Sequence, residues 1–336
     1  MLRSNWVVTF ALTLGLVSGV LAGIAPIAEA ATTLKIGTLA PGDSAWGKEF
    51  KRWSNDVAAD TNGELQLDFQ WNGQAGDEVL MVQKIRSGQL DGAAVTAVGL
   101  AQTGVTDVLL FQMPGLFANW GKLDAARNAM RADFDQQFQQ KGFTVLGWGD
   151  VGAAKTMSIG FEVRHPSDLQ GKGVFFLSGD PIGPKVFATI GGVNPREVSV
   201  PEILPNLTNG SITVLTTPPL AAEQLQWASR VTHINTLTTA FAIGAIIVSS
   251  SRMQGLPQNL KDVLANRGRE AAERLTKSIR NLDAQAFARL KSTKSAYEPN
   301  DAEKGEWRDL FTKVRQQLRG SVFTPAVFDK AVQLAQ

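Results

Sequence analysis

Side chains that could carry out catalysis are few in this 336-residue chain. It has two histidines, His165 and His233, and no cysteine, which excludes thiol chemistry, disulfides and cysteine-based metal sites. His165 precedes Pro166 in a predicted loop, and the apolar-polar run around His233 favours a structural role. No G-x-S-x-G or H-E-x-x-H motif is present. We therefore predict no catalytic residue, no metal and no cofactor, with an exported hydrolase or lyase built on distant carboxylates as an open alternative.

One segment superficially has the composition of a phosphate-binding loop. Residues 147–156 read GWGDVGAAKT, but the glycine and the lysine are not adjacent, so the spacing does not match that loop. The formal net charge of +2 gives no argument for nucleic-acid binding. Neither a nucleotide nor a nucleic acid is an expected partner.

Residues 168–195, DLQGKGVFFLSGDPIGPKVFATIGGVNP, show the local elements most clearly. A polar turn leads into an apolar run at 174–177, which predicts a buried strand. Ser178 and Asp180 offer helix-capping oxygens and Pro181 suits a first helical position, so a helix is predicted at 182–190. Gly191 and Gly192 should end it. Strand, helix and glycine stop make half of a βαβ unit.

The rest of the chain repeats this alternation of strands and helices. It predicts a mostly parallel sheet covered on both faces by helices. A second series starts near Lys155, and the segment from Gln258 onward reads as charged, solvated helix. The further predicted strands are 34–39, 65–71, 92–98, 212–216 and 242–249, and the helices are 46–60 and 76–86.

The N-terminus has the pattern of a secretory signal peptide. Arg3 is followed by an uncharged apolar stretch that ends in a small-residue site, Ala28-Glu29-Ala30. We expect cleavage near Ala30/Ala31, periplasmic localisation and no stable membrane insertion afterwards; a retained anchor is the alternative. Removing 30 of the 336 residues leaves 306, more than a typical single core, so two lobes are expected.

The order of motifs along the chain resembles the solute receptors of TRAP transporters, of the DctP type. The resemblance rests on LKIGTLAPGDSAWGKEF at 34–50, WNGQAGDE, IRSGQLDGA, DLQG, IGGVNP, PEILPNLTNG and the IIVSSSRMQGLP segment. It implies an α/β, two-lobe periplasmic binding protein, type II-like with Venus-flytrap closure, mixed sheets covered by helices and a helical C-terminal region. The implied parts are a signal peptide at 1–30, lobe I at 31–153 plus 241–283, lobe II at 154–240 plus 284–320, and a C-terminal helix at 321–336.

The resemblance also indicates where a ligand would bind, and how this chain departs from the family. The arginine that usually grips a carboxylate falls on Phe175, and the common Q-E-N-P element is Leu215, Thr216, Thr217, Pro218. By the same comparison, an asparagine position becomes Leu39 and a glutamate position becomes Thr96.

A second family arginine aligns with Lys155, or with Ala154 if the register shifts by one residue. Lys155 could meet an anion as a point charge or could be a plain surface lysine. Trp46, Trp148 and Trp227 are candidate aromatic walls, and Asp77 of the WNGQAGDE motif completes the predicted ligand-binding set.

These departures predict a ligand that is neutral, or apolar and aromatic, because a buried carboxylate without donors costs several kcal/mol. The expected function is capture of a small molecule by lobe closure and delivery to TRAP membrane subunits, a small DctQ-like and a large DctM-like one. A lipid or hydrophobe carrier on the same fold is the alternative. The sequence leaves the ligand, the oligomeric state and a sensor role open.

Overall fold

Two long strands, β4 (Phe143–Ser158) and β8 (His233–Ser249), pair antiparallel at the centre of the fold. The computed structural model describes residues 1–2 and 31–336, and residues 31–336 form one unit. The predicted signal peptide therefore lies outside the described residues, apart from Met1 and Leu2. Within 31–336 the strands form one nine-stranded sheet in the order β2-β1-β3-β8-β4-β7-β5-β6, and β9 pairs with β8.

The other elements alternate along the chain much as the sequence predicts. The strands are β1 (Thr32–Thr38), β2 (Leu65–Gln70), β3 (Gly92–Thr96), β5 (Gly173–Leu177), β6 (Asn194–Val198), β7 (Val214–Thr217) and β9 (Ser295–Tyr297). The α-helices are α1 (Ala45–Asp60), α2 (Glu78–Arg86), α3 (Ala97–Ala101), α4 (Trp120–Gln140), α5 (Ile182–Ile190), α6 (Val200–Thr208), α7 (Pro219–Gln224), α8 (Ser250–Gly255), α9 (Gln258–Thr293), α10 (Asp301–Leu318) and α11 (Pro325–Ala335). Short 3₁₀ helices are η1 (Thr106–Gln112), η2 (Pro166–Leu169) and η3 (Trp227–Ser229).

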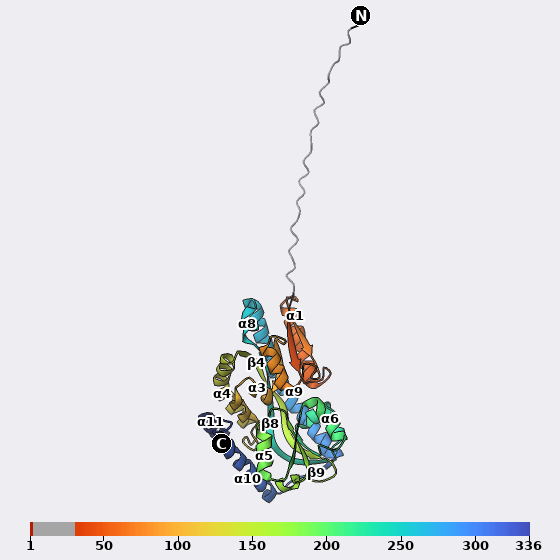
Figure 1. The fold of residues 1–336 in the computed structure, drawn as a ribbon, viewed down its shortest axis with the longest axis vertical. Helices are drawn as coiled ribbons and strands as arrows, with labels where there is room; N and C mark the ends of the chain where they lie inside the picture. Colours follow the sequence, from red (N-terminus) through yellow and green to blue (C-terminus); the bar gives the residue numbers. More distant parts are fainter. Residues whose placement is uncertain (3–30) are drawn as a thin grey trace. The chain divides into compact units, whose positions relative to one another are not determined.

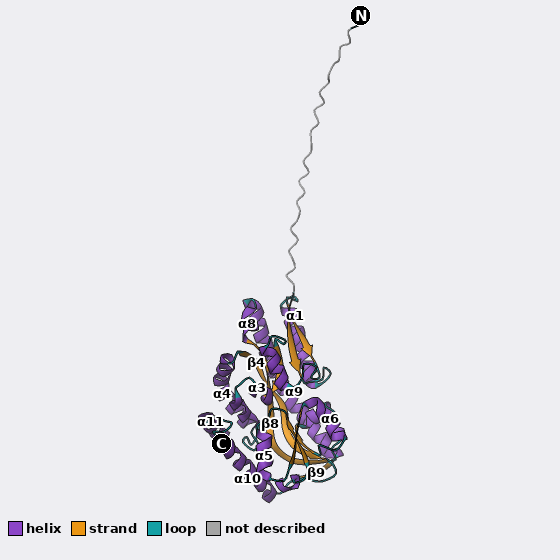
Figure 2. Cartoon of the chain, in the orientation of Figure 1, coloured by secondary structure: helices purple, strands orange, loops and turns teal. Residues whose placement is uncertain are grey.

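The sheet is mixed at its centre, so the prediction of a mostly parallel sheet is corrected there. Strand β1 runs parallel to β2 and β3, and β5 runs parallel to β6 and β7. Between these groups, β3 pairs antiparallel with β8 and β7 pairs antiparallel with β4. The strand predicted at 242–249 is only the last part of β8, which runs on through both groups (Figures 1 and 2).

Strands β4 and β8 connect two groups of elements. Strand β3 pairs with residues 244–248 of β8, whereas β7 pairs with residues 155–158 of β4. In Figure 1 the orange elements around α1 lie near one end of this pair and the green elements α5 and α6 near the other. We call strands β1, β2 and β3 with the helices beside them the β1–β3 group, and strands β5, β6 and β7 with α5 and α6 the β5–β7 group.

Alternate residues of β8 supply the hydrophobic cores on the two faces of the sheet. Ile246 and Val248 pack into a core with side chains of α1 and α9. Ala245 and Ile247 pack into another core with side chains of α2, α3 and α4. The predicted covering of the sheet on both faces is thus present, and the fold class is confirmed.

Helix α5 follows the predicted boundaries closely. The carboxylate of Asp180 accepts hydrogen bonds from the backbone N–H groups of Ile182 (2.9 Å) and Gly183 (3.2 Å), which satisfies donors of the first turn. The helix ends at Ile190 because Gly191 has a φ of 75°, a conformation that glycine adopts without strain. These local signals place Asp180 at the junction between β5 and α5.

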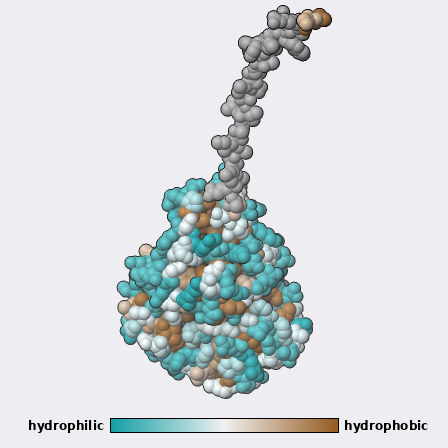
Figure 3. Space-filling view, turned by 45° about the horizontal axis from the view of Figure 1, so that its top comes forward, coloured by the Kyte–Doolittle hydropathy of each residue, from teal (hydrophilic) through white to brown (hydrophobic). Residues whose placement is uncertain are grey.

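Apolar side chains are concentrated inside the described part of the chain. The face drawn in Figure 3 is mostly hydrophilic, with apolar residues in small separate groups. Across residues 31–336, Leu80 is the one large apolar side chain that is strongly exposed, at 41%. No helix among the described residues has the length and apolar character needed to span a bilayer.

Candidate functional site

A cavity of about 340 Å³ lies between the β1–β3 group and the β5–β7 group. Its walls come from segments far apart in the sequence, because β4 and β8 pass through both groups. The contributing segments are 38–41, 94–98, 147–156, 174–187, 216–227 and 239–246, together with side chains of α1, α9 and α10. This volume is within the range of small-molecule sites.

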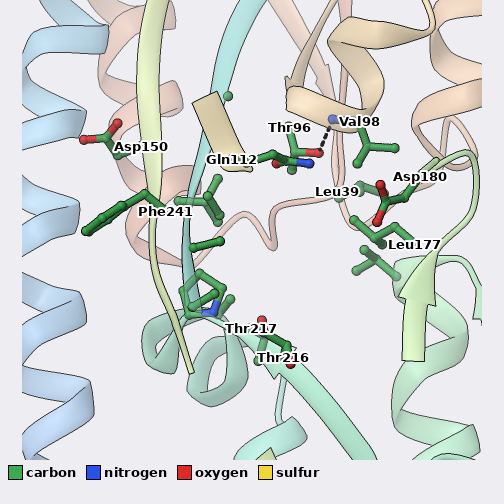
Figure 4. Close-up of a pocket in the computed structure, with 18 of the residues that line it drawn as sticks. Leu39, Thr96, Val98, Gln112, Asp150, Leu177, Asp180, Thr216, Thr217 and Phe241 are labelled. Atoms are coloured by element: carbon green, nitrogen blue, oxygen red, sulfur yellow. Dashed lines mark hydrogen bonds between the residues drawn. The ribbon is translucent and has the colours of Figure 1, made fainter. Parts of the chain in front are cut away.

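Most of the lining is aliphatic or aromatic. Leu39 and Leu177 lie together on one side of the close-up in Figure 4, and Phe241 of β8 lies on the other. The aromatic lining residues are Trp46, Phe50, Phe175, Phe176, Phe187, Trp227, Phe241, Trp307 and Phe311. Such a wall provides a large apolar contact area and few fixed polar contacts.

Two acidic side chains in the lining accept hydrogen bonds from nearby backbone N–H and hydroxyl groups of the protein. The buried carboxylate of Glu78 accepts hydrogen bonds from the hydroxyl of Thr96 (2.6 Å) and the N–H of Gly99 (3.0 Å). Burial is the largest effect on Glu78 and raises its pKa, in spite of these hydrogen bonds. Burial likewise raises the pKa of Asp180, although Ile182 and Gly183 donate to it. Neither carboxylate brings with it a cation that could bind an acidic ligand.

The third acidic lining residue, Asp150, is neutralised by two arginines that do not line the cavity. Its side chain is wholly buried and binds Arg127 (2.7 Å) and Arg280 (2.6 Å). Both arginines also bind Asp124, at 2.9 and 2.6 Å. The guanidinium of Arg280 lies 4.3 Å from the ring centroid of Trp120. These arginines are therefore occupied within the protein and are not free to bind a ligand carboxylate.

Lys155, the candidate cation of the predicted site, does not line the cavity. Its ammonium donates to the carbonyl of Thr236 (2.8 Å) and the hydroxyl of Thr238 (2.6 Å), and lies 4.5 Å from the ring centroid of Phe287. Burial lowers the pKa of Lys155 to about 8, partly offset by the carboxylate of Asp283. Ala154 and Thr156 line the cavity instead, and Ala154 is the residue that the alternative register assigns to this place.

Five of the residues predicted for the site do line the cavity: Leu39, Trp46, Thr96, Phe175 and Thr217. They come from separate segments of the chain, and the fold brings them together. Trp227, the third candidate aromatic wall, lines the same cavity. No arginine, lysine or histidine belongs to the lining within the described part of the chain.

Three other predicted residues lie elsewhere, each for a visible reason. Asp77 caps α2, where its carboxylate accepts from the N–H of Leu80 (2.8 Å). Trp148 packs in the core and donates to Asp135 (3.1 Å). Leu215 is fully buried in a core of the β5–β7 group, while its neighbours Thr216 and Thr217 face the cavity.

The sequence reasoning missed several lining residues. Phe241 and Gln112 point into the site in Figure 4, and Asp180 was assigned only a capping role. The A-F-A pattern at 240–242 offers a weak signal, because an aromatic residue stands between small ones in a strand. No local pattern marks Gln112, which ends η1.

The site has no catalytic constellation that the geometry would support. Asp150 is ion-paired, Glu78 is held by the start of α3, and neither histidine lines the cavity. Among the described residues, no group of three or more His, Asp or Glu side chains could hold a metal ion. The arrangement is suited to enclosing a ligand.

Comparisons with known proteins agree with this geometry. The sequence profile of DctP, described as "Bacterial extracellular solute-binding protein, family 7", matches residues 36–320. The C4-dicarboxylate-binding periplasmic protein DctP of Rhodobacter capsulatus is 20% identical over 279 residues, covering 82% of this chain and 83% of that protein.

Solved structures give the same fold. The sugar acid binding protein DctPAm of Advenella mimigardefordensis, in complex with galactonate, has a TM-score of 0.84 at 17% identity and covers 91% of this chain and 98% of its own. A TRAP periplasmic solute binding protein of Sulfurospirillum deleyianum with bound succinate has a TM-score of 0.83 at 18% identity, covering 90% and 99%. At these identities the likeness establishes the fold alone.

Proposed function

The chain belongs to family 7 of the bacterial extracellular solute-binding proteins, the DctP family of TRAP periplasmic receptors, and from this premise we propose that its ligand is a neutral, mainly apolar small molecule. Proteins of this family bind small molecules and are not enzymes, so the hydrolase or lyase alternative is set aside.

One observation carries the proposal about the ligand. The ionisable side chains among the described lining residues are Glu78, Asp150 and Asp180, all of them acids. Asp150 is already paired with Arg127 and Arg280, and the described lining offers no basic side chain to a carboxylate ligand. An uncompensated buried charge costs several kcal/mol. The structural relatives named above were solved with galactonate and succinate, both acids. This receptor is therefore proposed to differ from them in ligand charge.

Phe175 supports the same conclusion. It occupies the position where the resemblance puts a carboxylate-binding arginine, and it lines the cavity with its ring near that of Trp227. An arginine could make two parallel hydrogen bonds to a carboxylate, whereas a phenylalanine supplies apolar contact only.

Binding is proposed to close two lobes around the ligand, lobe I at 31–153 plus 241–283 and lobe II at 154–240 plus 284–320. Hydrogen bonds join the two lobes, and two of them involve glutamine side chains. The amide of Gln102 donates to the carbonyl of Gly179 (3.2 Å), and the N–H of Ala45 donates to the side-chain carbonyl of Gln224 (2.8 Å). Ligand contacts to both lobes would favour this closed arrangement over an open one.

The proposed route follows from the family. The signal peptide at 1–30 directs the chain to the periplasm and is removed near Ala30/Ala31. The closed receptor then delivers its ligand to a TRAP membrane permease with a small DctQ-like and a large DctM-like subunit.

A pair of ligands that match in size and differ in charge tests the proposal. Equilibrium dialysis of the mature protein would compare 2-acetylnaphthalene with 2-naphthoate, and succinate and galactonate would serve as acidic references. We expect the neutral ketone to bind at least about tenfold more tightly than 2-naphthoate. Tighter binding of any of the three acids would overturn the neutral-ligand proposal.

Native mass spectrometry gives an independent result. Extraction of whatever co-purifies with the protein should yield an uncharged, largely apolar compound. Recovery of a phospholipid or a free fatty chain would instead support the carrier alternative, and recovery of a sugar acid would contradict both.

A further inference from the structure

The indole of Trp227 lines the cavity, and its hydrogen-bond donor is unused. Trp227 is 4% exposed and lines the cavity, yet no described residue accepts a hydrogen bond from its Nε1–H. Two other tryptophans of the lining have acceptors: Trp46 donates to the carbonyl of Asp150 (3.5 Å) and Trp307 to that of Arg164 (2.8 Å). Trp227 thus differs from its counterparts in the same wall.

The nitrogen of Trp227 is not sealed in the core. Among the described residues, the one fully enclosed side-chain nitrogen or oxygen without a partner is Nε1 of Trp53. The nitrogen of Trp227 also has no partner but is not fully enclosed, so it keeps accessible surface, and the cavity is the space that this residue lines. A donor left unpaired in a site that loses its water costs free energy comparable to a lost hydrogen bond.

Thr217 offers a second unused group in the same wall. It ends β7, is 6% exposed and lines the cavity, and no described side chain or carbonyl pairs with its hydroxyl. The neighbouring hydroxyl of Thr216 is instead 3.2 Å from that of Thr156. Figure 4 shows Thr216 and Thr217 together at one end of the site, away from Thr96.

The chemistry of these groups limits what a ligand can carry. An indole N–H only donates, so its partner must be an acceptor, and a threonine hydroxyl can donate to the same kind of atom. The described lining contains acids and no basic side chain, which disfavours a charged acceptor such as a carboxylate. The remaining choice is an uncharged oxygen, as in a ketone, aldehyde, ester or amide carbonyl.

We infer that the receptor recognises a mainly apolar molecule through a neutral carbonyl oxygen, which accepts from Nε1–H of Trp227 and from the hydroxyl of Thr217. The inference rests on the proposed function, because it assumes an uncharged ligand in this cavity. Phe175 positions the indole: its ring centroid lies 6.4 Å from that of Trp227, with the ring planes at 54°. The residue in the place of the family's arginine thus supports a single neutral donor instead of supplying a charged one.

An isosteric pair of probes isolates the carbonyl. In 2-acetylnaphthalene and 2-isopropenylnaphthalene, C=O is replaced by C=CH₂ with little change in shape. Equilibrium dialysis should give the ketone about three- to tenfold tighter binding to the unmodified protein, the range of one neutral hydrogen bond.

Replacing Trp227 with benzothienylalanine, whose sulfur takes the place of the N–H, then removes the donor and keeps the ring. We expect the preference for the ketone to fall to about twofold or less, with little change for the alkene. Thr217→Val should reduce the preference by a smaller factor. Trp71→Phe alters a tryptophan outside the cavity and should leave the preference unchanged.

The outcomes separate the two proposals. Equal binding of ketone and alkene to the unmodified protein, or an unchanged preference after the benzothienylalanine replacement, would overturn the carbonyl inference while leaving the neutral-ligand function intact. Binding of 2-naphthoate in preference to both neutral probes, or failure of both to bind, would count against the proposed function itself.

Discussion

On the cavity side of β4, Ala154 and Thr156 border a space whose described lining contains no basic side chain; behind it, Lys155 is buried against Phe287. The ammonium of Lys155 already has two oxygen partners, on Thr236 and Thr238. Neighbouring residues of one strand therefore face very different electrostatic environments. The chain contains cations close to the cleft, but the fold turns them away from it.

The same contrast recurs at Asp150. Asp150 belongs to the cavity wall, while its wholly buried carboxylate binds Arg127 and Arg280, which do not line the cavity. Because the cations behind the wall are paired within the protein, an acidic ligand would gain little from them. The preference of this receptor for a ligand charge thus depends on where the cations of the protein are paired, as well as on which residues line the cavity.

The largest expected effect comes from removing the charge of Asp150. In Asp150→Asn, the buried Arg127 and the half-buried Arg280 would both lose the negative charge that they share. We expect the free energy of unfolding to fall by about 3 kcal/mol or more, because breaking a buried ion pair leaves an uncompensated charge. Urea denaturation followed by tryptophan fluorescence measures the loss.

Asp133→Asn is the matched control for this change. It removes the carboxylate of an exposed pair with Lys330 (2.8 Å), which should contribute less than about 1 kcal/mol. If the two variants lost equally little stability, the arginines behind the wall would not depend on Asp150. Tighter binding of 2-naphthoate to Asp150→Asn would show that a freed guanidinium reaches the cavity.

Phe175→Arg introduces a cation into the lining of the cavity and should reverse the preference for a neutral over an acidic ligand. The new guanidinium should improve binding of 2-naphthoate by about ten- to a hundredfold, as expected for hydrogen bonds to a charged group, and weaken binding of 2-acetylnaphthalene. Phe175→Leu adds no cation to the site and should preserve the preference for the neutral ketone over 2-naphthoate. Dialysis of both ligands against both variants gives the comparison, and an unimproved affinity for 2-naphthoate in Phe175→Arg would mean that residue 175 does not control ligand charge.

The sequence allowed prediction of elements that have strong local signals. Helix α5 has the predicted limits because capping by Asp180 and the glycine at 191 act within a few residues. The mixed centre of the sheet was not predictable in the same way. Its direction depends on β4 and β8 pairing across eight intervening helices and strands, and only part of β8 was recognised.

The side chains of the site were predictable only where the strand is regular. Strand β4 has irregular pairing between Asp150 and Gly152, and again on both sides of Lys155. Each bulge changes which face the next side chain takes, so counting residues could not decide between Ala154 and Lys155. Trp46 and Trp148 show the same limit: both are buried tryptophans, and only tertiary packing makes one a wall of the cavity and the other part of the core.

The pH dependence of stability should report the burial of Lys155. Its pKa falls from an ordinary 10.5 to about 8 in the folded protein, mainly through burial. Between these values the unfolded chain holds the proton more tightly, so the free energy of unfolding should rise as pH rises. We expect a gain of about 1–2 kcal/mol from pH 8 to 9.5 relative to Lys155→Met, in which this titration is absent.

Urea titrations of the unmodified protein and of Lys155→Met across this pH range measure the difference in their free energies of unfolding. The contributions of other groups that titrate in this range cancel in that difference. Ligand binding provides the second readout. Lys155→Met should leave the affinities for 2-acetylnaphthalene and 2-naphthoate the same within about twofold, because the lysine does not line the cavity. A selective loss of 2-naphthoate binding would show that Lys155 reaches the ligand and would remove the contrast between the two sides of β4.

The smallest expected effect concerns the contact that spans the cleft at Gln102. In Gln102→Ala the hydrogen bond to the carbonyl of Gly179 is lost from an exposed position, so it should contribute only about 0.5 kcal/mol to closure. Dissociation of 2-acetylnaphthalene, followed by stopped-flow fluorescence, should accelerate about two- to threefold. Gln285→Ala removes an exposed glutamine that bonds Asn281 within α9, away from the cleft, and should leave the rate unchanged. Equal rates for the two variants would mean that apolar contacts in the cavity hold the lobes closed without help from this polar contact, which would sharpen the difference between the mainly apolar cavity and its polar surroundings.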